Sequence, residues 1–527
     1  MIYRTYNCGE INEKLINKKV ILCGWVINII KFKYIYIIYI KDFYKKIKTI
    51  LLKKNNKNND IIKKGYLLRI KGIVKNNKII NKNIKDSNIE ILIIKLSILN
   101  KSIKHPITYN NIKNSHILLY KYNYLLFRNN NYKNIFIYKN LMLYKIRKIL
   151  YKLNFLEIDT PILSEYLSIS GSKVFNIKIN NNKLELSQSP QIFKQLLMIG
   201  GVDKYYQIIK CFRNESYRND RLIEFTQLDF EFSYVNKNDI INFSEKLIKY
   251  IFKNIFNKKI NKFKKIDYIN VIKKYGSDKP NLFFNFKIKK IYIKKKKIIY
   301  FIIKNNKYKL NIKNIINIIN KCNILNKYKI FYIYKNNIIN YKYNKNILKI
   351  INLKKEYIYI FIKKDLIKNI NIYLKMGQII NEIIDKLIRC NTIYNKYYPI
   401  WIYNYPLFKK KKNKIYSFNH PFTSPIDNNN INFKSKSNSY DLVINGLEIA
   451  SGSIRINSYK IQKQILNLLF FYNKKIINKY FSFFLKALKF GAPPHGGIAF
   501  GIERILSLIF NKNIIDIIPF FKKKYEK

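Results

Sequence analysis

The sequence predicts an α+β protein built around antiparallel strands, and three segments support this prediction. Residues 205–213 and 225–232 are extended runs on either side of a polar turn, as in a β-hairpin. Residues 491–505 contain a Gly/Pro-rich turn, a short apolar strand and the start of a helix. Residues 1–106 contain short strands of alternating polarity. Together they indicate a sheet with helices beside it and a separate N-terminal β-domain.

The hairpin holds the first candidate site. After its turn, Leu228 and Phe230 fall on one face of the strand, and Phe225, Asp229 and Glu231 on the other. Three arginines occupy the end of the first strand and the turn: Arg213, Arg218 and Arg221. Arginine forks suit phosphates, and an aromatic ring suits a stacked purine. The pattern indicates an ATP site. The alternative is a solvated hairpin whose arginines face water.

The segment 491–505 supplies a second candidate site. Ile502, Ile505 and Leu506 follow the spacing of one buried helix face, so that Arg504 lies off this face in the first turn. Gly501 before it allows close approach of backbone or ligand, and a helix N-terminus attracts anions. The pattern predicts a second phosphate contact. The alternative is a core helix with a surface arginine.

Together these segments resemble motifs 2 and 3 of the class II aminoacyl-tRNA synthetases, and the match narrows to aspartyl-tRNA synthetases of the bacterial type. Four further strings occur in the family's order: SQSPQIFKQLLM (187–198), YGSDKPNL (275–282), FNHPFTSP (418–425) and YDLVINGLEIASGSIRI (440–456). NFLEIDTPIL (154–163) is similar to motif 1, an amphipathic helix that runs into a strand. The resemblance implies an antiparallel β-sheet core flanked by helices, with an N-terminal OB-fold barrel and an insertion domain.

Five regions are expected on this basis. Residues 1–106 would form the OB-fold-like anticodon-binding domain, around Cys-Gly-Trp-Val, and 107–135 a hinge. Residues 136–278 would form the first part of the catalytic core and 396–527 the second part. Between them, 279–395 is rich in Lys, Ile, Asn and Tyr and matches the family's insertion by position alone. The alternatives are an ordinary β-domain for the first region and a spacer for the insertion.

Composition adds less than the charge suggests. The chain has 527 residues and a formal net charge of +72, which would ordinarily indicate a nucleic-acid partner. The excess is mostly lysine scattered among Ile, Asn, Tyr and Phe, all with A/T-rich codons, so that genome bias accounts for much of it. A basic surface would still hold tRNA phosphates in a salt-dependent way.

The numbers of cysteines and histidines bear on the cellular compartment and on a possible zinc site. The five cysteines are dispersed without a CxxC pair, which predicts a reducing compartment, and four histidines make a zinc site improbable. The apolar runs are too short to span a bilayer, and no signal peptide is recognised. We therefore expect a cytoplasmic protein. The resemblance adds a homodimer formed through motif 1.

ATP and Mg²⁺ are the cofactors that the resemblance implies. An ionised α-carboxylate attacks the α-phosphorus of ATP, so that the enzyme has to align the reactants and neutralise charge, without a strong base. The implied catalytic residues are Arg213 at the α-phosphate, Arg504 at the γ-phosphate and Glu448, which with Asp441 would hold Mg²⁺. The implied ATP contacts are Arg213, Asn214, Glu215, Phe225, Glu448, Gly501, Ile502, Glu503 and Arg504.

The resemblance also implies a site for L-aspartate. Its positions are Ser170, Ser189, Gln191, Lys194, Arg213, Asn419, His420 and Arg455. Lys194 and Arg455 would place two cations around one small side chain, and asparagine would leave both cations without a counter-charge. The alternative for Lys194 is a solvated charge on a helix surface. Three positions depart from the family: Ser170 stands for a glutamate, Leu222 for a glutamine and Asn419 for a histidine.

Three functions remain from the sequence. The first is an aspartate–tRNA ligase that charges tRNA(Asp). The second is a non-discriminating ligase that also charges tRNA(Asn), because the positions that usually read the anticodon align with Ile29 or Ile30 and with Ile37. The third is a non-catalytic tRNA-binding relative, and the joint presence of Arg213, Glu448 and Arg504 opposes it.

Overall fold

The computed structural model divides into two compact units, residues 1–134 with 519–527 and residues 135–518. It describes residues 2–52, 62–76, 88–106, 121–164, 174–179, 182–215, 221–293, 296–304, 329–334, 337–339, 357–363, 370–389, 394–411, 414–471 and 473–520. Ser170 and Arg218 lie outside the described residues.

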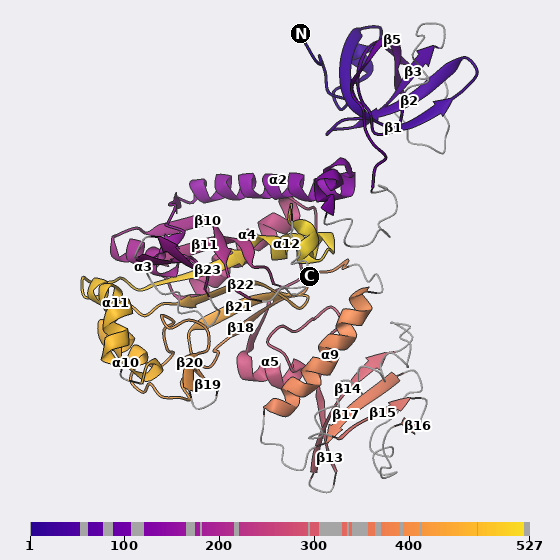
Figure 1. Ribbon diagram of the computed structural model, residues 1–527. Helices are drawn as coiled ribbons and strands as arrows, with labels where there is room; N and C mark the ends of the chain where they lie inside the picture. Colours follow the sequence, from indigo (N-terminus) through magenta and orange to yellow (C-terminus); the bar gives the residue numbers. More distant parts are fainter. Residues whose placement is uncertain are drawn as a thin grey trace. The chain divides into compact units, whose positions relative to one another are not determined.

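The first unit is built on a closed five-stranded β-barrel with strand order β1-β2-β3-β5-β4 (Figure 1). Its strands alternate between buried and partly exposed residues, which is the pattern of a small barrel with a filled interior. Leu22, Ile38, Leu68 and Ile91 lie in its core. The elements of this unit are η1 (Glu13–Leu15), β1 (Lys19–Lys31), β2 (Ile35–Lys41), β3 (Lys46–Leu52), β4 (Leu67–Asn76), β5 (Ile89–Asn100) and η4 (Asn123–Arg128). The expected N-terminal barrel is confirmed.

An eight-stranded sheet with order β12-β18-β21-β22-β23-β11-β10-β6 forms the centre of the second unit. The inner pairs are antiparallel, and only the two outermost pairs, β12 with β18 and β6 with β10, are parallel. The strands are β6 (Leu156–Glu157), β10 (Lys204–Phe212), β11 (Glu224–Ser233), β12 (Lys264–Asp267), β18 (Pro399–Tyr403), β21 (Ser439–Ile444), β22 (Leu447–Ile454) and β23 (His495–Gly501). The predicted antiparallel core is therefore present.

One face of this sheet is apolar and carries helices. Phe230 of β11 and Phe500 of β23 belong to the same core as Ile146 of α2, Ile248 of α4 and Leu506 of α12. Figure 1 shows α2, α4 and α12 along this side of the sheet. The helices of the unit are α2 (Asn130–Lys152), which begins in the first unit, α3 (Gln191–Ile199), α4 (Lys237–Asn254), α5 (Tyr268–Tyr275), α9 (Asn371–Arg389), α10 (Tyr459–Leu469), α11 (Lys474–Leu488), α12 (Ile502–Phe510) and η5 (Ile514–Ile517).

The other side chains of the same strands are polar. On β11, Asp229 and Glu231 alternate with Leu228 and Phe230, so that the carboxylates lie on the face opposite the helices α2 and α4. Both carboxylates are fully buried. The period of two in the sequence therefore places buried charge on one face of the sheet and aromatic packing on the other.

The stretch between the two parts of the core contains a second sheet. Its strand order is β13-β14-β17-β15-β16, and all pairs are antiparallel. The strands are β13 (Lys289–Ile293), β14 (Lys296–Lys304), β15 (Lys329–Tyr334), β16 (Asn337–Ile339) and β17 (Tyr357–Lys363). After them α9 returns to α5, where a Cβ added to Gly377 would overlap the backbone of Gly276. Only glycine allows this approach.

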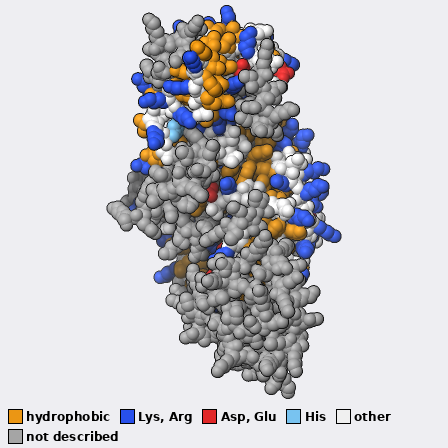
Figure 2. All heavy atoms as spheres, turned by 90° about the vertical axis from the view of Figure 1, so that its right-hand side faces the viewer, with side chains coloured by type: hydrophobic (Ala, Val, Ile, Leu, Met, Phe, Trp, Pro, Cys, Tyr) orange, Lys and Arg blue, Asp and Glu red, His pale blue; other side chains and the backbone are white. Residues whose placement is uncertain are grey.

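Two small sheets complete the described strands. One contains β7 (Leu163–Ser164), β9 (Asn182–Leu186) and β8 (Asn176–Ile179), and the other contains β19 (Phe408–Lys411) and β20 (Lys414–Ser417). Figure 2 shows Lys and Arg side chains over much of the described part of one face, with few Asp or Glu among them. Among the described residues, no helix has the length and apolar character needed to cross a membrane.

Candidate active site

Two clusters of charged side chains lie on the polar side of the eight-stranded sheet. The first, which we call the nucleotide cluster, contains Arg213, Lys279, Asp441, Glu448 and Arg504. The second, the buried quartet, contains Lys194, Asp229, Glu231 and Arg455. Both clusters contain residues from elements that are far apart in the sequence, including the helices α3 and α12.

Arg213 follows β10 directly, and its side chain lies over the ring of Phe225 with 5.0 Å between the guanidinium carbon and the ring centroid. The hairpin register brings them together, because Cys211 is paired with Phe225 and Phe212 with Glu224. The Nε atom of Arg213 is buried and has no hydrogen-bond partner among the described residues. Burial, together with the nearby Arg504, lowers the pKa of this guanidinium from its ordinary value. Arg213 thus keeps donor capacity for a ligand.

Glu448 and Arg504 meet across β22 and α12. Nη1 of Arg504 donates to the backbone oxygen of Glu448 at 2.9 Å and to its Oε1 at 3.3 Å. Lys279, in the turn after α5, contacts Oε2 of the same carboxylate at 2.9 Å. Burial alone would raise the pKa of Glu448, but Arg504 and Lys279 outweigh it and hold the pKa at about 2. The carboxylate is therefore ionised at neutral pH.

Asp441 lies beside Glu448 on the neighbouring strand β21. Burial first, and then the negative charge of Glu448, raise the pKa of Asp441 to about 7. Its Oδ1 atom is buried and has no hydrogen-bond partner in the part of the chain that the structure describes. Two adjacent carboxylates, one with an open oxygen, fit Mg²⁺, which takes one or two carboxylates and completes its shell with phosphates and water. The described residues contain no group of three or more His, Cys, Asp or Glu that could hold a metal.

The other residues predicted for ATP differ in their surroundings. Asn214 is exposed, and Glu215 pairs with Arg221. Gly501 precedes α12 as its N-cap residue, and Ile502 is buried in the core. Glu503 is buried, and its two oxygens accept from Nζ of Lys139 at 3.0 Å and from the backbone N of Thr226 at 2.9 Å. The first hydrogen bond joins α12 to α2, and the second joins α12 to β11 beside Phe225.

The buried quartet is a network of ion pairs. Nζ of Lys194 on α3 lies 2.8 Å from Oδ1 of Asp229 and 3.1 Å from Oε2 of Glu231. Arg455, the residue after β22, donates through Nε to Oε1 of Glu231 at 2.9 Å. Burial would raise the pKa of Glu231, but Arg455 and Lys194 outweigh it and hold the pKa at about 2. A side chain on Gly497 of β23 would overlap the Glu231 carboxylate.

This network corrects one argument drawn from the sequence. Lys194 and Arg455 are both buried, which excludes the surface alternative for Lys194. They are, however, already neutralised by Glu231 and Asp229, because these carboxylates share the polar face of β11. Asparagine in the pocket would therefore not leave two buried cations without counter-charge. The missing counter-charge therefore does not explain how asparagine would be rejected.

Two side-chain amides are among the remaining residues predicted for aspartate. Nε2 of Gln191, on the α3 face that also carries Lys194, and Nδ2 of Asn419 are buried and have no hydrogen-bond partner among the described residues. Burial, followed by Arg455 and Lys194, lowers the pKa of His420 to about 3, so that this ring is neutral at pH 7. Ser189 is half-buried beside the start of α3.

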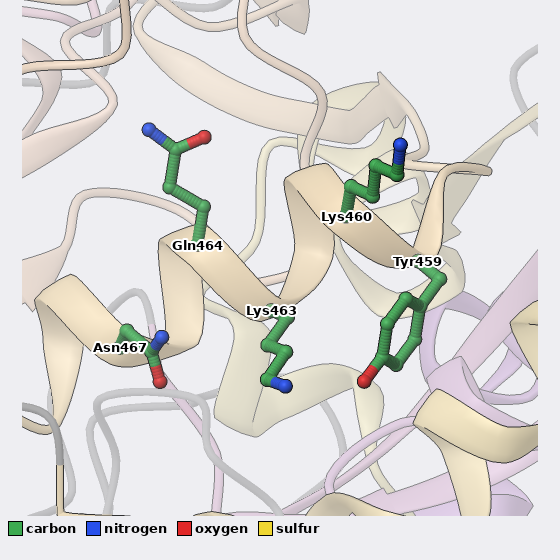
Figure 3. A pocket seen from close by; sticks show the side chains of 5 residues that line it. All are labelled: Tyr459, Lys460, Lys463, Gln464 and Asn467. Atoms are coloured by element: carbon green, nitrogen blue, oxygen red, sulfur yellow. The ribbon is translucent and has the colours of Figure 1, made fainter.

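A hollow of about 340 Å³ also occurs on α10, and no residue of either cluster lines it. Figure 3 shows its lining, which is one ring, two lysines and two amides: Tyr459, Lys460, Lys463, Gln464 and Asn467. None of the residues predicted for ATP or aspartate lines it. The hollow is open, and its lysines extend from an exposed face of the helix.

The comparisons with known proteins identify the family. A family model described as tRNA synthetases class II (D, K and N) matches residues 115–524. The chain belongs to this family. The fold class predicted from the sequence is confirmed with it.

Relatives within the class II synthetases agree with the aspartyl resemblance. An "Aspartate--tRNA ligase" of Buchnera aphidicola subsp. Schizaphis graminum is 37% identical, over 98% of this chain and 95% of the relative. One from Mycoplasma capricolum is 34% identical over 98% of this chain and 95% of the relative. An "Aspartate--tRNA(Asp/Asn) ligase" of Borrelia garinii is 35% identical over 99% of this chain and 95% of the relative. The predicted membership of the aspartyl-type synthetases is confirmed.

A solved synthetase structure agrees in fold. The asparaginyl-tRNA synthetase from Pyrococcus horikoshii, complexed with asparaginyl-adenylate, matches with a TM-score of 0.65 at 18% identity. The match covers 100% of this chain and 99% of that structure.

Sequence reasoning missed two contributors to the synthetase site. It placed Lys279 in the string YGSDKPNL without a role, and it did not pair Glu231 with Lys194 and Arg455. The acidic residues on the polar face of β11 were a signal for the pairing of Glu231, because buried carboxylates require cations. For Lys279 no signal was present, since its contact depends on a turn 169 positions from Glu448.

Proposed function

We propose that the protein is an aspartate–tRNA ligase that activates L-aspartate with ATP and Mg²⁺ and transfers it to the 3′ end of tRNA(Asp). The observation that carries this proposal is that the same sheet holds an ionised quartet and Arg213, whose Nε is free to donate to a ligand. The quartet fixes Lys194 and Arg455 in place, and Arg213 of the nucleotide cluster has no ion-pair partner among the described residues.

Electrostatic alignment is sufficient for the first step. Arg213 would receive the α-phosphate. The ring of Phe225, over which the Arg213 guanidinium lies, would stack on the purine, because one aromatic ring can contact both a guanidinium and a base. Arg504, in the first turn of α12, would receive the terminal phosphate. Glu448 and Asp441 would hold Mg²⁺, which supplies further neutralisation of the phosphates when bound.

Selection of aspartate would depend on hydrogen-bond donors. Lys194, Arg455, Gln191 and Asn419 all offer N–H groups, and the two amide nitrogens have no hydrogen-bond partner within the described ranges. A carboxylate accepts at both oxygens, whereas the amide nitrogen of asparagine would face a donor. The negative charge of aspartate adds to a quartet that is already neutral, so that Arg213 would supply the counter-charge.

The ammonium group of the substrate requires an acceptor. Ser170, which stands where the family has a glutamate, lies outside the described residues. Oδ2 of Asp229 is buried and has no hydrogen-bond partner among the residues that the structure describes, while its Oδ1 accepts from Lys194. We assign Asp229 as the acceptor for the ammonium, in addition to the positions predicted from the sequence.

The tRNA range defines a second candidate function. Relatives named for aspartate alone match this chain, and so do relatives named for both tRNA(Asp) and tRNA(Asn), such as that of Borrelia garinii. Ile30 and Ile37 lie on β1 and β2 of the barrel, where the family reads the anticodon with polar and aromatic groups. This favours a ligase that also charges tRNA(Asn).

Assembly and location complete the proposal. The face of α2 and the strands that follow leave apolar groups exposed, among them Tyr151, Leu156 and Leu163. A two-fold homodimer would cover them, and cytoplasmic residence fits the free thiols of Cys8, Cys23 and Cys211. Light scattering should give twice the chain mass at micromolar concentration. A stable, active monomer would contradict the dimer.

ATP–pyrophosphate exchange tests the proposed activity. Exchange should depend on L-aspartate and should be far weaker with asparagine or glutamate. Charging of purified tRNA(Asp) and tRNA(Asn) by the same preparation then separates the two candidate functions. A folded protein that binds tRNA but supports no exchange with any amino acid would establish the non-catalytic alternative.

A further inference from the structure

The nucleotide cluster contains one more cation than the proposed function uses. Glu448 is held by two cationic side chains, Arg504 at Oε1 and Lys279 at Oε2. Arg504 has a proposed role at the terminal phosphate, whereas Lys279 has none. Its side chain is 30% exposed, so that a ligand can reach it without displacing core residues.

The backbone around Lys279 is fixed. Helix α5 ends at Gly276, which has a left-handed φ of 70°, and the N–H of Lys279 donates to Oγ of Ser277 at 3.0 Å. Two residues later Asn281 is buried and donates to the hydroxyl of Tyr394 at 3.0 Å. Lys279 therefore extends from a turn that is tied down on both sides, and only its side chain has freedom to move.

Charge balance distinguishes the states with and without nucleotide. The carboxylate of Glu448 contacts two cations, Lys279 and Arg504. These three groups together carry one excess positive charge. A divalent cation bound at Glu448 would repel both Lys279 and Arg504 at close range. The triphosphate that accompanies the metal offers several acceptor oxygens to the displaced cations.

We propose that Lys279 is a further positively charged residue of the nucleotide site, paired with Glu448 in the unliganded chain and transferred to the phosphates of ATP when the metal occupies Glu448. This inference rests on the proposed function and deepens it. The exchange couples metal and nucleotide binding, because Glu448 releases a phosphate-binding cation as it accepts the metal. A purely structural Lys279 would neutralise Glu448 and make no contact with ATP.

Calorimetric titration of the full-length protein tests this exchange without measuring catalysis. Mg·ATP is titrated in the absence of aspartate and tRNA, and ATP is titrated separately in EDTA. Lys279→Met should weaken Mg·ATP binding about tenfold or more and metal-free ATP binding by less than about threefold, since the loss is one charge-assisted contact made only with metal present. Lys279→Arg should restore most of the affinity.

Lys249→Met is the matched control. Lys249 forms an ion pair with Glu245 on α4, outside both clusters, and its loss should leave both titrations unchanged. If Lys279→Met does not fold, as judged by its thermal unfolding, Lys279→Gln keeps a hydrogen-bond donor toward Glu448 and replaces it in the same titrations.

The outcomes separate this inference from the proposed function. Equal Mg·ATP affinity in parent and Lys279→Met would overturn the inference and leave the function standing. An equal loss with and without metal would contradict the exchange, because Lys279 would then attract phosphates independently of Glu448. A parent that does not bind Mg·ATP at all would overturn both.

Discussion

The two charged clusters of the catalytic sheet differ in how completely they are paired. In the buried quartet, Lys194 and Arg455 share Glu231, and Asp229 completes the pairing, all away from water. In the nucleotide cluster, Nε of Arg213 and Oδ1 of Asp441 have no hydrogen-bond partner among the described residues. A closed network fixes geometry at a high cost if one member is removed. An open one keeps its groups available for phosphates and metal.

This difference suggests a division of roles. The quartet is a preformed frame for one small amino acid, whereas the nucleotide cluster exchanges its internal ion pairs for a ligand. Substitutions in the quartet should therefore affect stability as well as aspartate binding. Substitutions in the nucleotide cluster should mainly affect nucleotide binding.

The largest effect is expected for Glu231→Gln. It leaves Lys194 and Arg455 buried with only Asp229 as a counter-charge, and should lower the free energy of unfolding by about 3–5 kcal/mol. Urea unfolding in a Trp25→Phe background measures it, because Trp401 in β18 then reports on the second unit alone. Glu224→Gln is the control on the same strand, since its pair with Lys210 is exposed and contributes about 0–1 kcal/mol.

A closely similar loss for the two variants would mean that the quartet is solvated and not a closed frame. The comparison between the clusters would then fail.

Acid should remove the same stabilisation gradually. The pKa of Glu231 is depressed from 4.5 to about 2 in the folded chain, which corresponds to about 3 kcal/mol of stability. A depressed carboxylate stabilises the fold above its unfolded pKa and loses this contribution as the pH falls through the folded value. The stability difference between the parent and Glu231→Gln should thus be constant above pH 4.5 and shrink toward pH 2. A difference that is independent of pH over this window would contradict the assignment.

The smallest effect is expected for Phe225→Leu in the nucleotide cluster. It removes the ring below Arg213, and should weaken ATP binding roughly five- to tenfold, about 1 kcal/mol, with little change in unfolding. Calorimetry with ATP measures the first and urea unfolding the second. Phe490→Leu, which changes an exposed ring, is the control. A loss of stability larger than the loss of ATP affinity would show that Phe225 is a packing residue.

Much of the fold was predictable because its signals are local. The alternation at Phe225 to Phe232 and the helical spacing of Ile502, Ile505 and Leu506 both agree with the structure. The order of motifs predicted the family. The insertion at 279–395 was predicted by position only, and its sheet β13 to β17 was not predicted, because its composition of Lys, Ile, Asn and Tyr resembles that of the rest of the chain.

Most residues of the candidate site were predictable from the sequence, but the ion pairs between them were less so. Lys194 and Arg455 were recognised by resemblance, but their partner Glu231 follows from the strand order that places β11 beside β23 and β22. Glu503 stays a predicted ATP contact, and its hydrogen bonds with Lys139 and Thr226 were not predicted. Side-chain direction over such distances requires tertiary structure, which spacing along the chain does not contain.

The central claim is that the quartet selects a carboxylate while the nucleotide cluster binds ATP independently. Arg455→Leu tests it most directly, with aspartate-dependent ATP–pyrophosphate exchange and Mg·ATP calorimetry measured on the same preparation. We predict a fall in kcat/KM for aspartate of about 100-fold or more, with the dissociation constant of Mg·ATP within about twofold of the parent. A variant that activates aspartate as well as the parent, or one that loses ATP binding to the same degree, would contradict the account.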